Sequence, residues 1–319
     1  MNRNDAYAVD IPLPPLPEQE KIVAKIEELF TQLDAGIAEL KNAQAQLKRY
    51  RQSVLKSAVE GELTKEWRES QSRGTGSPLP YEPASQLLEH VLGERREKWK
   101  VEGGKKKYKE PAAPDVEGLP DLPEGWAWAG FEQISTHIVD CLHTTPKFTE
   151  SGKYCIDTTC IKPGKILFDR VRFVSEETYQ DRVRRLIPEA GDILFAREGT
   201  IGTTLVVPEN VELCLGQRMM MFRTIKAMMP YFFMYAMLSP TFENQWKPKV
   251  TGTTSPHVNI GDIRLMALPM PSIREQQRIV EMVERRLSVA DEIEKDEALV
   301  RAERLRQSIL KNAFEGQLA

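Results

Sequence analysis

Hydrophobic residues recur at alternating steps of four and three along residues 18–62, a spacing that is typical of a coiled-coil seam. The seam positions are Ile22, Ile26, Leu29, Leu33, Leu40, Leu47 and Val54. A helix of about forty residues rises roughly 60 Å at 1.5 Å per residue, which is a spacer length. The pattern therefore predicts a first spacer helix whose apolar seam needs a partner.

The end of the chain repeats this segment. The first copy contains LPEQEKIV and closes with RQSVLKSAVEGELT, whereas the second contains IREQQRIV and closes with RQSILKNAFEGQLA. Residues 267–319 are therefore predicted to form a second spacer helix, and Ser272 with Glu275 has the spacing of a capping box. Its apolar stripe comprises Ile279, Val283, Leu287, Ile293, Val300 and Ile309. The two helices can pair antiparallel with each other or with copies in another chain.

The pattern between the repeats changes twice. Residues 63–118 are rich in charged and turn-forming residues, and predict a linker with one helix from Ala84 to Lys100. In residues 119–266, short β-branched and aromatic runs broken by Gly, Pro and Asn predict strands, and an apolar stretch predicts a helix from Pro230 to Leu238. The predicted fold class is α+β: one mixed α/β domain flanked by two long coiled-coil helices. Residues 1–17 are interpreted as a lead-in or as the end of a preceding domain.

Composition narrows the class of protein. The 41% hydrophobic and 29% charged residues are typical of a globular chain, and no apolar run reaches the roughly 18 residues that span a membrane. Four cysteines at irregular spacing predict reduced thiols, without paired metal-ligand spacing, in a cytoplasmic protein. The net charge of −3 argues against indiscriminate binding to polyanions.

The sequence lacks the motifs of catalysis. There is no G-x-x-x-x-G-K-[ST] phosphate loop, no G-x-G-x-x-G cofactor turn and no Asn/Asp-Pro-Pro-Tyr/Phe set for amino methylation. The acids Asp192 and Glu198 near Arg197 resemble part of a nuclease site, but its lysine is missing. We therefore expect a noncatalytic chain that holds no metal and no cofactor of its own.

Three segments, taken in order, carry a family resemblance: LPEGWAWAGFEQI, GDILFAREGTIGTTLVVP and TTSPHVNIGDIRLMALPMPSIREQQRIV. Together with the flanking repeats, they resemble the specificity subunits of type I restriction-modification enzymes. The resemblance implies that residues 119–266 are a target-recognition domain that reads one half of a split site in double-stranded DNA. It also implies that the spacer helices fix the distance between half-sites and hold methyltransferase and restriction subunits.

The resemblance carries further expectations about partners. It places adenosylmethionine, ATP and Mg²⁺ in the partner subunits, with no cofactor in this chain. A complete member of the family has another recognition domain before the first spacer helix. The order spacer, reader, spacer therefore marks a half-length or N-terminally truncated form, with a homodimer as one arrangement.

Candidate DNA contacts follow from the chemistry of groove recognition, which uses Arg, Lys, Asn and Gln for bases, and hydroxyls, amides and basic groups for phosphate. Such residues must lie on loops. The candidates are Thr144, Thr145, Lys147, Arg197, Thr200, Gln217, Arg218, Thr253, Thr254, Ser255 and His257, with Arg182, Arg184 and Arg185 as a basic cluster suited to phosphate. Because basic and acidic residues nearly balance in residues 119–266, we expect the chain alone to bind DNA weakly.

Two other functions compete with this interpretation. A coiled-coil scaffold whose central domain binds protein would dimerise and would show no dependence of DNA binding on a methyltransferase. An adenine-specific enzyme would need an adenosylmethionine pocket that the sequence does not reveal.

Overall fold

The computed structural model of the chain describes residues 12–75, 82–101, 107–294 and 298–318; the side chains of residues 72–75, 292–294 and 298–300 lie outside this description. The chain divides into two compact units. Unit 1 comprises residues 1–51 and 287–319, and unit 2 comprises residues 52–286. Most of the predicted lead-in, residues 1–17, lies outside the described residues.

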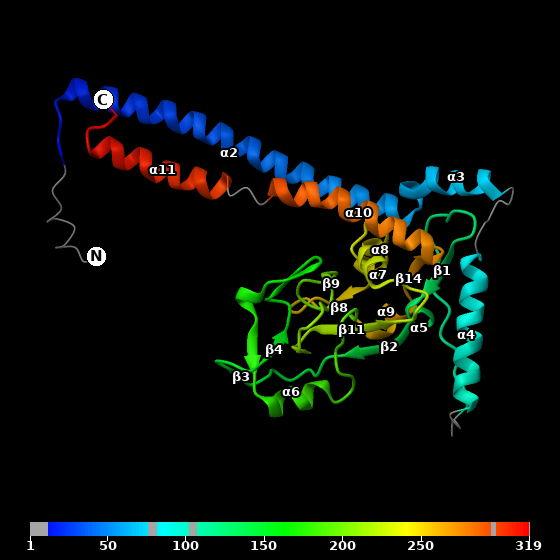
Figure 1. Cartoon of the computed structure of the whole chain (residues 1–319). Coiled ribbons are helices and arrows are strands. Elements are labelled where there is room, and N and C mark those ends of the chain that lie inside the picture. Colours follow the sequence, from blue (N-terminus) through cyan, green and yellow to red (C-terminus); the bar gives the residue numbers. More distant parts are fainter. Residues whose placement is uncertain (1–11, 76–81, 102–106, 295–297, 319) are drawn as a thin grey trace. The chain divides into compact units, whose positions relative to one another are not determined.

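Unit 1 is built from helices that pair in antiparallel fashion. Helix α2 (Leu16–Val59) supplies its first part to unit 1, together with the end of α10 (Ile273–Glu294) and all of α11 (Ala298–Phe314). Arg51 donates to Asp291 over 2.6 Å, and Arg306 pairs with Asp34. Asp34, earlier in α2, pairs with Arg306 of α11, whereas Arg51, later in α2, pairs with Asp291 of α10, which precedes α11. Helix α2 therefore runs antiparallel to the end of α10 and to α11, and it lies beside α11 (Figure 1).

The burial of side chains in α2 follows the predicted seam. Six seam positions in unit 1 are half-buried and Val23 outside the seam is exposed, but Tyr50, which continues the spacing of four and three, is exposed as well. These half-buried positions are Ile22, Ile26, Leu29, Leu33, Leu40 and Leu47. The long first helix thus fits a coiled-coil spacer.

The second predicted spacer forms α10 and α11 among the described residues. Ile279 and Val283 are buried within unit 2, as is Val54 of the first copy. In unit 1, Leu287 is half-buried and Ile309 is buried. The side chains of Ile293 and Val300 lie outside the described residues.

A buried junction joins the end of the first repeat to the start of the second, inside unit 2. The carboxylate of Glu275 is fully buried and accepts hydrogen bonds from Thr64 Oγ1 (2.7 Å), Arg68 Nη1 (2.6 Å) and Trp126 Nε1 (2.8 Å). Ser272 caps α10 by accepting from the Glu275 backbone N–H, but the Glu275 side chain does not close the predicted capping box. The buried charge is instead balanced by Arg68, whose guanidinium lies 5.6 Å from the Trp126 ring.

The described part of the segment between the repeats contains more helix than the predicted linker. It holds the short turn η1 (Glu62–Thr64), α3 (Lys65–Thr75) and α4 (Ala84–Val101), so the predicted helix is confirmed and α3 is an addition. The sequence missed α3 because KEWRESQSRGT carries no apolar stripe. After α4, the Asp115 N–H donates to Leu265 O over 2.8 Å, and the Ala112 N–H donates to Glu132. This stretch therefore lies along the mixed domain.

The mixed domain contains two four-stranded sheets. Strands β2 (Ser135–Asp140), β11 (Met219–Thr224), β8 (Ile193–Ala196) and β9 (Thr204–Val206) form an antiparallel sheet in that order. Strands β10 (Leu213–Leu215), β4 (Lys153–Ile156), β7 (Arg172–Val174) and β3 (Phe148–Thr149) form a mixed sheet in which β10 and β4 are parallel. All residues of β8, an inner strand, and of β10, the outer strand beside β4, are buried, as expected for strands read as continuous apolar runs.

Short pairs complete the strands. They are β1 (Ala127–Gly130) with β14 (Ala267–Met270), β5 (Ile161–Lys162) with β6 (Lys165–Ile166), and β12 (Val250–Thr251) with β13 (His257–Val258). The helices of the domain are α5 (Phe131–Ile134), η2 (Phe168–Arg170), α6 (Glu176–Val183), α7 (Pro230–Met237), α8 (Pro240–Trp246), η3 (Lys247–Lys249) and α9 (Ile260–Leu265). Helix α7 confirms the predicted apolar helix.

Aromatic packing fixes the core of the antiparallel sheet. Phe131 lies 5.0 Å from Phe222, 5.4 Å from Phe233 and 5.6 Å from Phe242, measured between ring centroids. Rings from α5, β11, α7 and α8 therefore meet, and each is at most 1% exposed. Burying such rings contributes roughly 2–3 kcal/mol each, which holds the sheet and its loops in place.

Among the described residues, no helix combines the length and apolarity needed to cross a lipid bilayer.

Candidate nucleic-acid interface

Three loops of the mixed domain leave one end of the antiparallel sheet. The register pairs Asp140 at the end of β2 with Met220, and Ala196 at the end of β8 with Met219 at the start of β11. Because neighbouring strands are antiparallel, the segments 141–147, 197–203 and 216–218 emerge at the same edge. Half of the sequence-predicted DNA contacts, seven of fourteen, lie on these segments.

Hydrogen bonds tie these loops to one another. Gln217 Nε2 donates to the His143 carbonyl over 2.6 Å, and Thr145 Oγ1 donates to Gln217 Oε1 over 3.3 Å. Glu198 Oε1 accepts from Ser255 Oγ in the loop between β12 and β13, and Glu198 forms a β-bridge with His257. The structure therefore brings four separate stretches of sequence into one connected surface, called here the loop cluster (residues 141–147, 197–203, 216–218 and 251–257).

Arg197 differs from the expectation of an exposed loop side chain. Its side chain is 8% exposed and donates through Nε to Asp140 Oδ1 over 2.9 Å and through Nη2 to Oδ2 over 3.3 Å. His143 Nε2 lies 3.1 Å from the same carboxylate. Arg197 therefore braces the loop after β2, and an unpaired Arg197 in this core would be costly.

The predicted basic cluster near α6 has mixed roles. Arg182 Nη1 donates to Leu215 O over 3.1 Å, and Nη2 donates to Thr144 O. Arg185 Nη1 donates to Asp140 O over 3.0 Å, whereas Arg184 is exposed and pairs with Asp181 of the same helix end over 3.0 Å. Arg182 and Arg185 thus support the loops, while Arg184 faces solvent.

The remaining candidates lie at the surface. Lys147, Thr200, Thr253 and Thr254 are exposed, as is Thr144, whose carbonyl is used by Arg182. His257 is half-buried, with Nδ1 3.0 Å from Ser255 O and Nε2 3.4 Å from Thr251 Oγ1. These hydroxyls and the lysine suit contacts to a sugar-phosphate backbone.

Sequence reasoning missed the acidic anchors of the loop cluster. Asp140 holds Arg197 and His143, and Glu198 holds Ser255 and Arg218. A carboxylate directly after an apolar strand, as in HIVD and LFARE, is the available signal. The signal is weak because Arg197 and Ser255 each lie 57 residues from the carboxylate that holds them in the sequence, and Arg218 lies 20 residues from Glu198.

The acid considered for a nuclease has a structural role. Asp192 is buried and accepts from Arg223 Nε and Nη2, each over 2.8 Å, and from the Glu189 N–H over 2.8 Å. Hydrogen bonding to Asp192 raises the pKa of Arg223 above its ordinary value. The pair thereby fixes the turn that leads into β8.

The cysteines lie inside the domain. Cys141, Cys155, Cys160 and Cys214 are buried free thiols, and burial raises the pKa of Cys160 to about 11 and raises that of Cys141. Among the described residues, no group of three or more His, Cys, Asp or Glu side chains is arranged to hold a metal ion.

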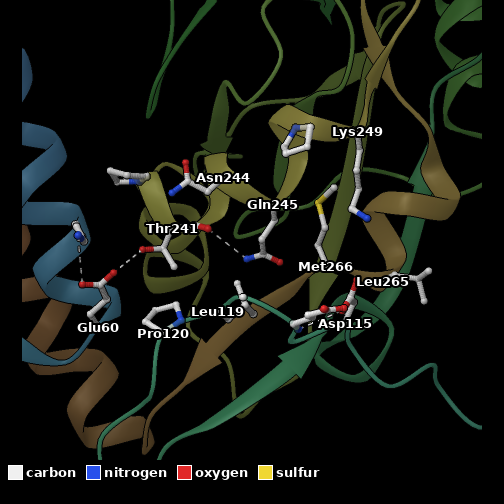
Figure 2. A pocket seen from close by; sticks show the side chains of 15 residues that line it. Glu60, Asp115, Leu119, Pro120, Thr241, Asn244, Gln245, Lys249, Leu265 and Met266 are labelled. Carbon is white, nitrogen blue, oxygen red and sulfur yellow. Dashed lines mark hydrogen bonds and ion pairs between the residues drawn. The ribbon is translucent and has the colours of Figure 1, made fainter.

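A cavity of about 490 Å³ in unit 2 includes none of the predicted DNA contacts. Figure 2 shows that Glu60 and Thr241 face each other at one side, joined by a 3.1 Å hydrogen bond. Gln245 also lines the cavity, but its amide is engaged with the backbone of Ala267, accepting from the N–H over 2.8 Å and donating to the carbonyl over 2.9 Å. These polar groups hold α8 in place, and the loop cluster remains the candidate site.

The chain is similar to known proteins in both sequence and fold. A family model described as the type I restriction modification DNA specificity domain matches residues 142–303, just over half of the chain. That match contains the described stretches of the loop cluster from residue 142 onward and the start of the second repeat.

Individual relatives extend the similarity. The chain is 27% identical to the type I restriction enzyme EcoDI specificity subunit of Escherichia coli, over all of this chain and 64% of that protein. It is also 27% identical to the EcoKI specificity subunit of E. coli K12, over 97% of this chain and 58% of that protein. The chain thus spans about three fifths of the length of the curated relatives it matches.

A solved structure shares the fold. A chain from work on complex assembly and conformational transition of the type I R-M system aligns with a TM-score of 0.57 at 19% identity, covering 99% of this chain and 64% of that one. Because the family model matches more than half of its residues, the chain belongs to the family of type I restriction-modification specificity subunits.

Proposed function

We propose that residues 119–266 read one half of a split DNA target through the loop cluster. The observation that carries the proposal is the convergence of four loops, which are separate in sequence, into one hydrogen-bonded surface. This surface offers guanidinium, hydroxyl and amide groups, the types that read base edges and position phosphates. A rigid loop scaffold supports recognition because little ordering remains to be done on binding.

The chain acts as a noncatalytic subunit. Methylation and cleavage belong to methyltransferase and restriction subunits, which carry adenosylmethionine, ATP and Mg²⁺, in a cytoplasmic complex. The names of the relatives support this assignment, since each is called a specificity subunit of a restriction enzyme. The ion pairs of the domain also favour a noncatalytic role. The carboxylates of Asp192 and Asp140 are each paired with an arginine, so neither is available as a catalytic acid.

The spacer helices set distance and hold partners. The antiparallel pair of α2 and α11 supports this role, since a coiled coil is stiff and its length sets the separation of whatever it carries. Inserting one heptad between Leu33 and Leu47 should lengthen the gap between half-sites and leave the bases read unchanged. Altered base preference at unchanged spacing would contradict the role of the helix in setting this distance.

Weak binding by the chain alone follows from its charges. Asp140 and Glu198 lie among the arginines of the loop cluster, so the surface releases few counterions when it meets DNA. We expect tight binding only in the complex with methyltransferase subunits. Tight and specific binding of the purified chain at moderate salt, measured by fluorescence anisotropy, would contradict this.

The deciding experiment maps methylated adenines in host DNA after co-expression of this chain with its methyltransferase subunit, with and without the gene for the chain. A split motif that gains methylation only in the presence of the gene supports the proposal. A symmetric motif indicates that two copies act as a homodimer. An unchanged pattern overturns the proposal and favours a coiled-coil scaffold.

A further inference from the structure

The arginines in the loop cluster, and Arg182 beside it on α6, differ in how much of each guanidinium is already occupied. Arg197 uses Nε and Nη2 on Asp140, and Arg182 uses Nη1 and Nη2 on backbone carbonyls. Bidentate reading of a guanine needs two adjacent N–H groups of one guanidinium. Arg197 and Arg182 therefore cannot read a base without giving up the contacts that hold the loops.

Arg218 keeps the required groups available. Its side chain is 48% exposed, and its Nε lies 3.1 Å from Glu198 Oε1. Among the described residues, Nη1 and Nη2 of Arg218 have no polar partner. These are the two groups that meet guanine O6 and N7 end-on. The guanidinium of Arg218 is therefore held near Glu198 at Nε, while Nη1 and Nη2 stay available.

Glu198 is itself fixed. Its side chain is 21% exposed, the same Oε1 accepts from Ser255 Oγ, and its backbone bridges to His257. The carboxylate therefore links the loop after β8 to the loop before β13 and presents a defined anchor to Arg218. A long side chain held at Nε loses little freedom on binding.

The backbone at Arg218 gives an independent indication. Its φ is 71°, in the left-handed region that side-chain-bearing residues rarely adopt. Its neighbours hold this conformation, since Gln217 is braced on His143 and the Arg218 carbonyl accepts from the Arg197 N–H over 3.1 Å. A strained position that carries arginine in place of glycine indicates that the side chain has a use.

We infer that Arg218 reads a guanine in the major groove by a bidentate contact, and that Glu198 is its positioning residue. This inference rests on the proposed function, and it adds the base type and the residue that reads it. It predicts that the half-site contains one G·C pair whose identity depends on Arg218.

The test uses the complete complex with the methyltransferase subunit and maps the methylated motif for Arg218→Gly, Arg218→Lys and Glu198→Gln. Arg218→Gly keeps the carbonyl contact and suits the left-handed backbone, so it should fold as well as the natural chain. It should lower the preference for one G·C position by roughly tenfold or more and leave the other positions unchanged. Arg218→Lys should not restore that preference, because an ammonium lacks the planar fork.

Arg184→Ala is the matched control. This exposed arginine should weaken methylation at every site alike and keep the motif. Glu198→Gln should relax the same position as Arg218→Gly, which a loss of general loop structure would not do. The inference is overturned if Arg218→Gly leaves the motif intact, or if all positions relax together. Absence of any motif with the natural chain would instead count against the proposed function itself.

Discussion

The two copies of the repeat share their local geometry and differ in what surrounds them. Gln19 donates to Pro14 O over 2.7 Å and Gln276 to Pro271 O over 3.0 Å, five residues back in each case. The helix ends also match, with Gly61 at φ 78° and Gly316 at φ 72°. Yet Glu275 is fully buried, while the corresponding Glu18 is half-exposed.

This contrast separates the contacts that depend on the repeated sequence itself from those that depend on its surroundings. Short-range hydrogen bonds recur in both copies because they depend on neighbours in sequence. The partners of Glu275, by contrast, are Thr64, the last residue of the first repeat, and Arg68 and Trp126, which lie after it. Glu18 has no such partners among the described residues. The same acidic residue is thus a surface group in one copy and the centre of a buried network in the other.

The largest effect should come from Glu275→Gln. The substitution removes the buried charge that pairs with half-buried Arg68, and breaking such a pair costs about 3 kcal/mol or more. Glu18→Gln should change stability by less than about 0.5 kcal/mol, because the residue is half-exposed. Guanidinium unfolding followed by tryptophan fluorescence measures both. Equal effects would show that the burial of Glu275 does not stabilise the junction.

The glycines offer a matched pair of substitutions. A Cβ at Gly61 would lie 2.3 Å from Pro123 Cγ, whereas one at Gly316 meets nothing within 4 Å. Both variants to Ala incur about 1 kcal/mol from the left-handed backbone. Gly61→Ala should cost a further 1–3 kcal/mol or so from overpacking. Thermal unfolding measures the loss of stability in both variants. A similar loss at both positions would show that the contact with Pro123 adds no steric cost.

Trp126→Phe isolates one hydrogen bond of the junction. The phenyl ring keeps most of the apolar contact but cannot donate to the Glu275 carboxylate, so we expect a loss of about 2 kcal/mol. Trp128→Phe is the control, since its indole donates to the neutral carbonyl of Pro120 over 3.2 Å and should cost about 1 kcal/mol. Urea unfolding of both variants measures the two losses of stability. A larger loss for Trp128→Phe than for Trp126→Phe would contradict the prediction.

The smallest effect is expected in unit 1. Arg306 and Asp34 pair between α11 and α2, with 45% and 60% of their side chains exposed. A double-mutant cycle on Arg306→Ala and Asp34→Ala should give a coupling energy of about 0.5 kcal/mol or less, falling with added salt. Coupling above about 2 kcal/mol would mean that the two helices of unit 1 are held together as tightly as the junction.

Periodic and local features were predictable from the sequence. The seam of α2, helix α4 and helix α7 follow from apolar spacing and from the Pro and Gly residues around them. The loops that form the loop cluster were also predictable, since turn residues flank each one. The helix α3 was not, because its polar sequence carries no stripe.

The roles of individual polar residues could not be predicted. Arg197 and Arg218 look alike in the sequence, and which one is buried depends on Asp140, a residue 57 positions before Arg197. Glu275 has the spacing of a capping box, but its carboxylate accepts hydrogen bonds from three donors that are distant in the sequence and not from the backbone of the helix start. Ion pairs between distant segments leave no periodic trace in a single sequence.

The pairing of β1 with β14 has a consequence for how such proteins diversify. Ala127 lies opposite Met270, so the chain enters and leaves the mixed domain at neighbouring points. A domain whose two ends meet can be exchanged for another of different sequence, with both splice points on one short strand pair. Since the braces of the loop cluster lie between those points, recombination there would transfer a complete set of loops with their supports.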